Sequence, residues 1–187
     1  LEAPKFTEVT TSQLTLLGLD YRTANADGTT TGHGNGMSVI IRMSDGRFIV
    51  IDGGFNTADH YNQFKKILKE QAKEYDPEGK NITIACWMIT HSHGDHQGLL
   101  QGKYNNLKSD GFKVENFLFN FMSDTERNKS INSSEKDEGG TVISSNWSSG
   151  EGGGWNKVYT AASALGAKTL VAHVGQIYYF ADWKMEI

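Results

Sequence analysis

The first half of the chain alternates short apolar runs with polar turns. Two apolar runs, at residues 38–41 and 47–51, are separated by a polar stretch that contains Asp45-Gly46. An Asp-Gly dipeptide between two apolar runs is a strong signal for a tight turn between antiparallel strands. The pattern therefore predicts a β-hairpin over residues 37–52.

The segment after this hairpin changes to a helical period. Its apolar residues recur every three or four positions and would share one face of a helix. Asn56 or Thr57 can cap the start of that helix, and Asp76-Pro77 follows its end. The expected core face consists of Tyr61, Phe64, Ile67, Leu68 and Ala72.

Residues 82–90 are dominated by β-branched and large apolar side chains. This composition is typical of a strand that is covered on both faces. Cys86 lies inside the run, and we expect it to be a small core residue rather than a ligand. Because it is the only cysteine, an internal disulfide is excluded.

The second half of the chain predicts further helices and strands around one polar segment. Residues 123–154 are rich in Gly, Ser and Asn, and we expect a long surface loop there, either a functional lid or a plain insertion. The expected elements are a helix within 97–107, a strand at 114–121, a helix at 155–165 ended by Gly166, strands at 168–174 and 177–180 joined by a turn at Gly175-Gln176, and the start of a strand at 183–187.

The composition narrows the class of protein without identifying it. With 187 residues, 37% hydrophobic and 21% charged, residues 1–187 suffice for one soluble α/β (α+β) domain, and no apolar run approaches the ~18 residues of a membrane span. The net charge of −4 argues against broad nucleic-acid binding but leaves a local phosphate site open. These data leave the compartment, cytoplasmic or secreted, and the oligomeric state open.

The six residues after the buried strand carry the candidate chemistry. His91 and His93 lie two apart at the end of an extended segment, so both imidazoles can face one metal ion. Gly94 would then permit a sharp turn, after which Asp95 and His96 can hold a second ion about 3.5–4 Å from the first. Imidazole and carboxylate ligands without a thiolate suit zinc best, with manganese or iron as alternatives.

The motif and its surroundings resemble a known family. Thr90-His91-Ser92-His93-Gly94-Asp95-His96-Gln97-Gly98 resembles the HxHxDH signature of the metallo-β-lactamase superfamily, and Ile51-Asp52-Gly53-Gly54 resembles its upstream strand-end motif. Residues 32–41, Gly-His-Gly-Asn-Gly-Met-Ser-Val-Ile-Ile, are similar to the glycine-rich opening of the competence-type, DNA-uptake branch. The resemblance covers about residues 30–100.

This resemblance implies a four-layer αββα sandwich with two metal ions at the sheet edge. His91 and His93 would bind metal one, and Asp95 and His96 would bind metal two. Asp95 would also be catalytic, because it would orient the nucleophilic water. Asp52 would support the metal loop from outside the ligand shell.

The remaining histidines do not complete the family's ligand set. His33 lies in a glycine-rich turn and His60 in an early helix turn, where we expect an ordinary loop residue and a solvent-facing residue. His173 could be the third ligand of metal one, although a structural role is favoured. Because the family takes a bridging aspartate and a last histidine from further downstream, the expectation is that this chain is an N-terminal fragment of the fold.

The function expected from the resemblance is hydrolysis by a metal-activated water, with a phosphodiester or related ester as substrate. Alternatives are an amide or thioester hydrolase of the lactamase or glyoxalase type, a di-iron redox variant, and a non-catalytic binding module that retains the fold. The motif is stronger support for a metal site than for any one substrate.

Overall fold

The computed structural model describes residues 12–20, 23–24, 26–27, 30–31, 35–90, 94–120 and 155–187. Side chains are not described at 19–20, 23–24, 30–31, 35 and 155–157. His33, His91, His93 and the expected loop at 123–154 therefore lie outside the described residues.

A mixed sheet is the centre of the molecule, which confirms the α/β class. Its order is β1 (Gln13–Asp20), β4 (Asn35–Arg42), β5 (Phe48–Ile51), β6 (Thr83–Ile89), β8 (Asn116–Phe119) and β9 (Lys168–Val171), with β7 (Lys113–Val114) also pairing with β6. The pairs β1–β4 and β4–β5 are antiparallel, whereas β5, β6, β8 and β9 run parallel. A separate two-stranded ribbon joins β2 (Thr23–Ala24) to β3 (Thr30–Thr31).

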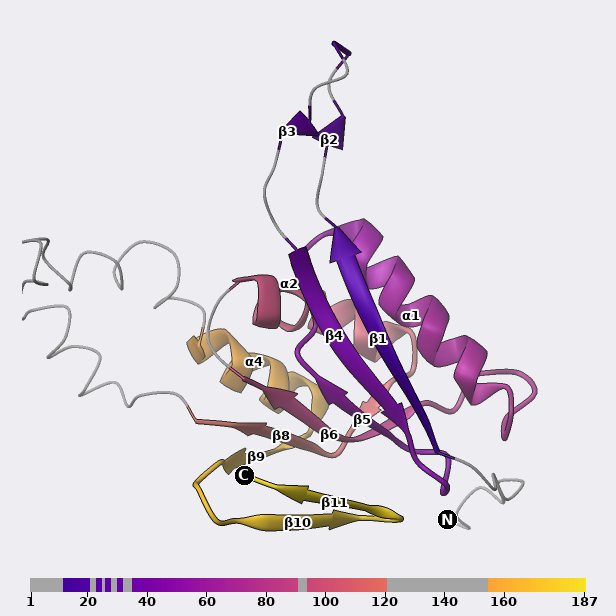
Figure 1. Cartoon of the computed structure of the whole chain (residues 1–187), viewed down its shortest axis with the longest axis vertical. Helices are drawn as coiled ribbons and strands as arrows, with labels where there is room; N and C mark the ends of the chain where they lie inside the picture. The colour runs from indigo at the N-terminus through magenta and orange to yellow at the C-terminus, as the bar shows by residue number, and fades with distance from the viewer. Residues whose placement is uncertain are drawn as a thin grey trace, which may run out of the picture.

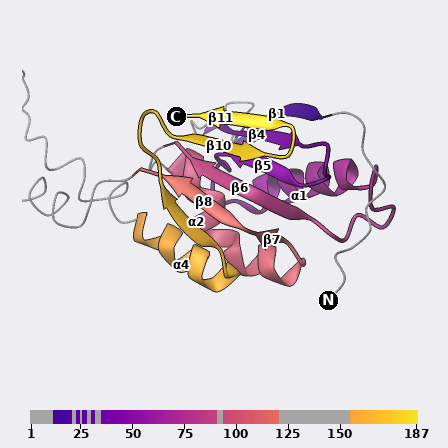
Figure 2. The same ribbon diagram turned by 90° about the horizontal axis from the view of Figure 1, so that it is seen from below.

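The two faces of this sheet are covered differently. Three helices, α1 (Ala58–Ala72), α2 (Gly94–Ser109) and α4 (Trp155–Leu165), lie on one face (Figure 1). The hairpin of β10 (Ile177–Phe180) and β11 (Trp183–Glu186) lies on the other, so that the described part of the chain has three layers (Figure 2). None of the described helices is both long and apolar enough to cross a membrane.

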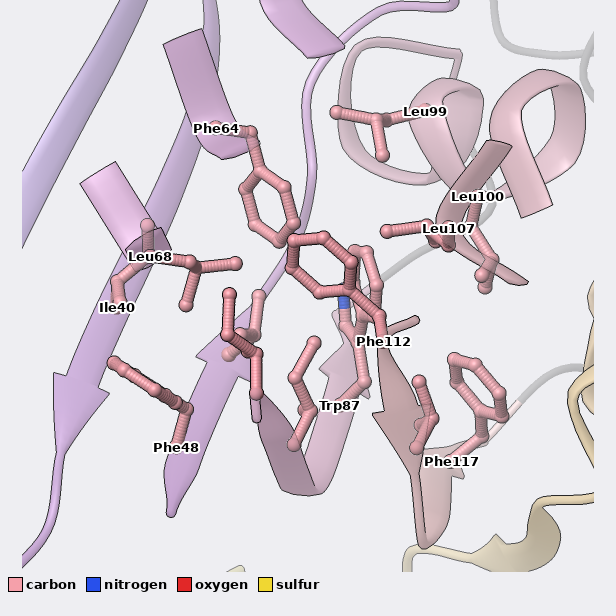
Figure 3. Packing of buried hydrophobic residues seen from close by; sticks show 14 of the residues in the cluster. Ile40, Phe48, Phe64, Leu68, Trp87, Leu99, Leu100, Leu107, Phe112 and Phe117 are labelled. Atoms are coloured by element: carbon pink, nitrogen blue, oxygen red, sulfur yellow. The ribbon is translucent and has the colours of Figure 1, made fainter. Parts of the chain in front are cut away.

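The helix-side core is built around an aromatic stack (Figure 3). Trp87 of β6 lies between Phe64 of α1 and Phe117 of β8, with ring centroids 5.2 Å and 6.0 Å away. Both arrangements are close to parallel, at 21° and 29°. This stack joins a helix to the two central parallel strands.

The hairpin and the first helix follow the sequence pattern. The strands β4 and β5 pair antiparallel, and Gly46 in their turn has a φ of 81°. Helix α1 begins after Thr57, whose hydroxyl accepts a hydrogen bond from the His60 backbone N–H at 3.1 Å. Four of the five expected core residues are buried, and Ile67 is half-buried.

The other elements are partly as expected. The strand β6 is buried on both faces, and Cys86 is 0% exposed, which confirms it as a core residue. Helix α4, with Gly166 at a φ of 69° after it, and the strands β10 and β11 are also confirmed. The strand expected at 114–121 is instead two short strands, β7 and β8, and β9 ends at Val171.

Helix α2 starts before the residues that the sequence pattern assigns to it. The expected helix within 97–107 begins earlier, at Gly94, so Asp95 lies in its first turn. Asp95 and His96 are therefore consecutive residues in the first turn of a helix.

Candidate metal centre

The candidate site lies where two neighbouring parallel strands end. Asp52 follows β5 and Thr90 follows β6, and these strands are paired in register from Ile49–Cys86 to Ile51–Met88. Because the carboxyl ends of parallel strands meet at one sheet edge, the two residues lie side by side. Helix α2 then returns to this edge with Asp95 and His96 in its first turn.

The Asp52 carboxylate is the centre of a buried hydrogen-bond cluster. Its side chain is 3% exposed. Oδ1 accepts the Thr90 backbone N–H at 2.9 Å, and Oδ2 accepts the Thr90 hydroxyl at 2.8 Å. The Nδ1 atom of His96 lies 2.7 Å from the same Oδ2. One carboxylate therefore links the end of β6 to the first turn of α2.

The backbone of Asp52 is held just as firmly. Its φ of 58° lies in the left-handed region, which costs a residue other than glycine about 1 kcal/mol or more. Its N–H donates to the Met88 carbonyl at 2.8 Å, and its carbonyl accepts from the Ser38 hydroxyl at 2.9 Å and the Trp87 indole N–H at 3.2 Å. Three strand residues thus stabilise a strained backbone at the candidate site.

The hydrogen bond to Asp52 also determines which nitrogen of His96 can bind a metal. An ionised carboxylate only accepts hydrogen bonds, so His96 Nδ1 carries the proton and donates it to Asp52. In the neutral ring the lone pair is then on Nε2, which lies 3.4 Å from Asp95 Oδ2. This is the arrangement by which a carboxylate orients a metal-binding histidine.

The distance between the two facing atoms fits a shared metal ion. Zinc binds histidine nitrogen at about 2.0–2.1 Å and carboxylate oxygen at about 2.0–2.2 Å, so tetrahedral ligand atoms lie about 3.3–3.5 Å apart. The observed Nε2–Oδ2 distance is 3.4 Å. Asp95 and His96 therefore fit two ligands of one ion.

Close backbone contacts fix α2 against the loop after β5. The Gly53 N–H donates to the His96 carbonyl at 2.7 Å, and the Leu99 N–H donates to the Gly54 carbonyl at 3.0 Å. A Cβ atom on Gly53 would lie 3.1 Å from the Trp87 ring, and one on Gly98 would lie 2.8 Å from the Asn56 backbone nitrogen. Glycines on both sides allow this approach.

The expectation that His60 faces solvent is wrong. The residue is 1% exposed, because the loop after β5 folds over the first turn of α1. Its Nδ1 accepts the Phe55 backbone N–H at 3.1 Å, and the two rings lie 5.7 Å apart. Its Nε2 has no hydrogen-bond partner among the described residues. His60 thus stabilises the loop that carries Asp52.

His173 lies at the same sheet edge but on a more distant strand. It follows β9, which is two strands from β6 and so about 10 Å away. It is exposed, and its backbone N–H donates to the Gln176 side chain at 2.7 Å. Among the described residues, no group of three or more His, Cys, Asp and Glu could hold a metal ion.

Three residues that form hydrogen bonds to Asp52, namely Ser38, Trp87 and Thr90, were not predicted to be part of the site. Thr90 is a polar residue directly after an apolar strand, and Ser38 stands inside an apolar run. A buried indole such as that of Trp87 needs a hydrogen-bond acceptor. These signals indicate buried polar contacts, but only the tertiary structure shows that all three contacts meet at Asp52.

Comparison with known proteins gives no assignment. No protein-family model matches the chain, and no curated protein matches it.

Proposed function

We propose that this protein is a metal-dependent hydrolase of the metallo-β-lactamase type. The observation that supports it best is the Asp52–His96–Asp95 arrangement, in which a buried carboxylate orients a histidine whose other nitrogen faces a second carboxylate at 3.4 Å. In this proposal the three described layers belong to a four-layer αββα sandwich.

The proposed centre holds two zinc ions. His91 and His93 would bind metal one, and Asp95 and His96 would bind metal two. Asp52 supports His96 from outside the ligand shell. When bound, the ions would lower the pKa of a shared water to near neutrality and so supply the attacking hydroxide.

The residues of the chain would each have a defined part in this hydrolysis. The Asp52 carboxylate keeps the His96 proton on Nδ1, and Asp95 orients the attacking water from the first turn of α2. The amino-terminal end of this helix carries a partial positive charge, which favours anionic groups at the site. Both features support chemistry in which negative charge develops at the sheet edge.

A phosphodiester or related ester is the proposed substrate class. The glycine-rich opening at residues 32–41 and the helix terminus at the site both favour an anionic ester. Amide and thioester hydrolysis, di-iron redox chemistry and ligand binding without turnover are the competing functions. A substrate panel distinguishes the other hydrolases and the binding module from this proposal, and the identity of the bound metal distinguishes the di-iron variant.

Metal stoichiometry tests the proposed centre. The purified chain is titrated with zinc, and native binding is compared for the wild type, Asp95→Asn and His96→Ala. Each substitution is expected to remove one bound ion. The control is Asp59→Asn, which changes an exposed acidic residue at the same place in the first turn of α1 and should leave the stoichiometry unchanged.

Turnover then tests the reaction class. The zinc-loaded protein is assayed with bis(4-nitrophenyl) phosphate, a chromogenic β-lactam and a thioester. Hydrolysis of the phosphodiester that is lost in Asp95→Asn supports the proposal. Turnover of only the lactam or thioester supports the alternative hydrolases, and zinc binding without turnover supports a binding module. A wild-type chain that binds no metal contradicts the proposal altogether.

A further inference from the structure

Thr90 makes two hydrogen bonds to one buried carboxylate. Its backbone N–H and its hydroxyl donate to the two different oxygens of Asp52, at 2.9 Å and 2.8 Å. A carboxylate held at both oxygens by one residue has little freedom to rotate. The plane of the Asp52 carboxylate is therefore set by the residue that directly precedes the HxHxDH motif.

The Thr90 hydroxyl also lies beside the ring of His96. Its oxygen is 3.4 Å from His96 Nδ1, whereas Asp52 Oδ2 is 2.8 Å away. A hydroxyl has one proton, and the closer, charged acceptor takes it. The oxygen of Thr90 then presents only lone pairs to Nδ1, which favours a proton on Nδ1 and disfavours one on Nε2.

We propose that Thr90 is a positioning residue whose hydroxyl, through Asp52, holds His96 in the tautomer that leaves Nε2 available to a metal ion. The metal part of this inference rests on the proposed function. Residues that support a metal ligand in this way typically change metal affinity by about tenfold or more when they are lost.

The backbone contacts of Asp52 separate this role from a general effect on folding. Ser38, Trp87 and Met88 hold the Asp52 backbone without any help from the Thr90 hydroxyl. Loss of that hydroxyl therefore removes one of the two contacts to Oδ2, while the Thr90 N–H still holds Oδ1 and the strained backbone stays in place. The expected defect lies in the His96 ring and not in the sheet.

The first experiment reads the tautomer directly in the metal-free protein. Long-range ¹H–¹⁵N NMR at pH 8 distinguishes a proton on Nδ1 from one on Nε2, and the His96 signals are identified by their absence in His96→Gln. Wild type and Thr90→Ser should have the proton on Nδ1, and Thr90→Val should populate the other tautomer. A wild-type His96 protonated on Nε2 overturns the proposal even if Thr90→Val does not fold.

The second experiment measures zinc affinity by competition with a chromophoric chelator. For the ion that Asp95→Asn removes, Thr90→Val should bind about tenfold more weakly than wild type, and Thr90→Ser should restore the affinity. Thr83→Val is the matched control, because Thr83 begins the same strand and makes no side-chain hydrogen bond in the described part of the chain.

The outcomes separate this inference from the proposed function. If the wild type binds no zinc, the metal centre is wrong, while the tautomer measurement still decides the role of Thr90. If Thr90→Val folds and matches the wild type in both tautomer and zinc affinity, Thr90 has no positioning role, while the metal centre stands.

Discussion

At the scale of single residues, Trp87 joins the helix-side core to the candidate centre. Its ring packs between Phe64 and Phe117, and its N–H donates to the Asp52 carbonyl. A Cβ atom on Gly53 would lie 3.1 Å from the edge of the same ring. The position of Asp52 therefore depends on core packing as well as on hydrogen bonds.

Cys86 is the neighbour of Trp87 in the same strand, and its chemistry can be predicted. Burial raises the pKa of its thiol from 9.0 to about 12, and the side chain is 0% exposed. At pH 8 the thiolate population is then roughly 1,000-fold lower than for a free thiol. We expect Cys86 to resist a thiol reagent such as DTNB in the native protein.

Denatured protein is the control for this prediction, and one thiol per chain should react there within minutes. Stoichiometric reaction at that rate under native conditions would contradict the buried position of Cys86.

At the scale of elements, two glycines of α2 face the loop that follows β5. A Cβ on Gly98 would lie 2.8 Å from the Asn56 backbone nitrogen and 3.1 Å from the Gly54 carbonyl oxygen. A Cβ on Gly102 would instead meet the Asn56 side-chain amide, at 1.9 Å from Oδ1. Asn56 is exposed, so its side chain can turn away, whereas the backbone at Gly98 cannot.

This difference predicts opposite effects of the same substitution. Alanine is favoured over glycine in a helix by about 1 kcal/mol. Gly102→Ala should therefore leave the free energy of unfolding unchanged or slightly higher, whereas Gly98→Ala should lower it by about 1–3 kcal/mol because of the backbone clash. Urea unfolding measures both, and equal effects of the two variants would refute the packing of α2 against this loop.

At the scale of the whole molecule, the β10–β11 hairpin forms a second layer on the sheet. Phe180, Trp183 and Met185 pack against the buried residues Ile41, Met43, Ile49 and Ala85. The turn of the hairpin is fixed by Asp182, which accepts hydrogen bonds from the Ser12 hydroxyl and from the Ser44 backbone N–H. One carboxylate thus connects this layer to both the start of β1 and the β4–β5 turn.

The Asp182 contact predicts a pH-dependent contribution to stability. Burial by itself raises the pKa of Asp182, but the hydrogen bonds from Ser12 and Ser44 outweigh it and lower the pKa from 3.8 to about 2. The native state therefore binds fewer protons than the unfolded state between these values. The stabilisation is present above about pH 4 and is lost as the pH falls to about 2.

Asp182→Asn should therefore reduce the free energy of unfolding at pH 6 by at most about 1 kcal/mol, because the carboxylate is exposed to solvent, and by less at pH 2.5. Urea unfolding at the two pH values measures the difference. Glu186→Gln is the control, since Glu186 lies on the same hairpin and pairs only with Lys184 among described residues. A pH-independent effect of Asp182→Asn would rule out this role for the carboxylate.

Several elements could be predicted from local sequence because local chemistry determines them. Asp45-Gly46 between apolar runs gave the β4–β5 hairpin, and the period from Tyr61 to Ala72 gave α1. Boundaries depend on tertiary contacts as well: α2 begins at Gly94, within the motif, where His96 and Leu99 bond to Gly53 and Gly54 rather than following the apolar pattern.

The sequence by itself determined the β4–β5 hairpin, helix α1, the buried strand β6, helix α4 and the β10–β11 hairpin, because turn residues and apolar period act over a few residues. Only the tertiary structure decided that the Asp52 carboxylate, 44 residues before His96, lies 2.7 Å from its Nδ1 atom, and that His60 is buried. The physical reason is that parallel strand pairing brings the ends of β5 and β6 together, a contact that no local pattern in either segment records.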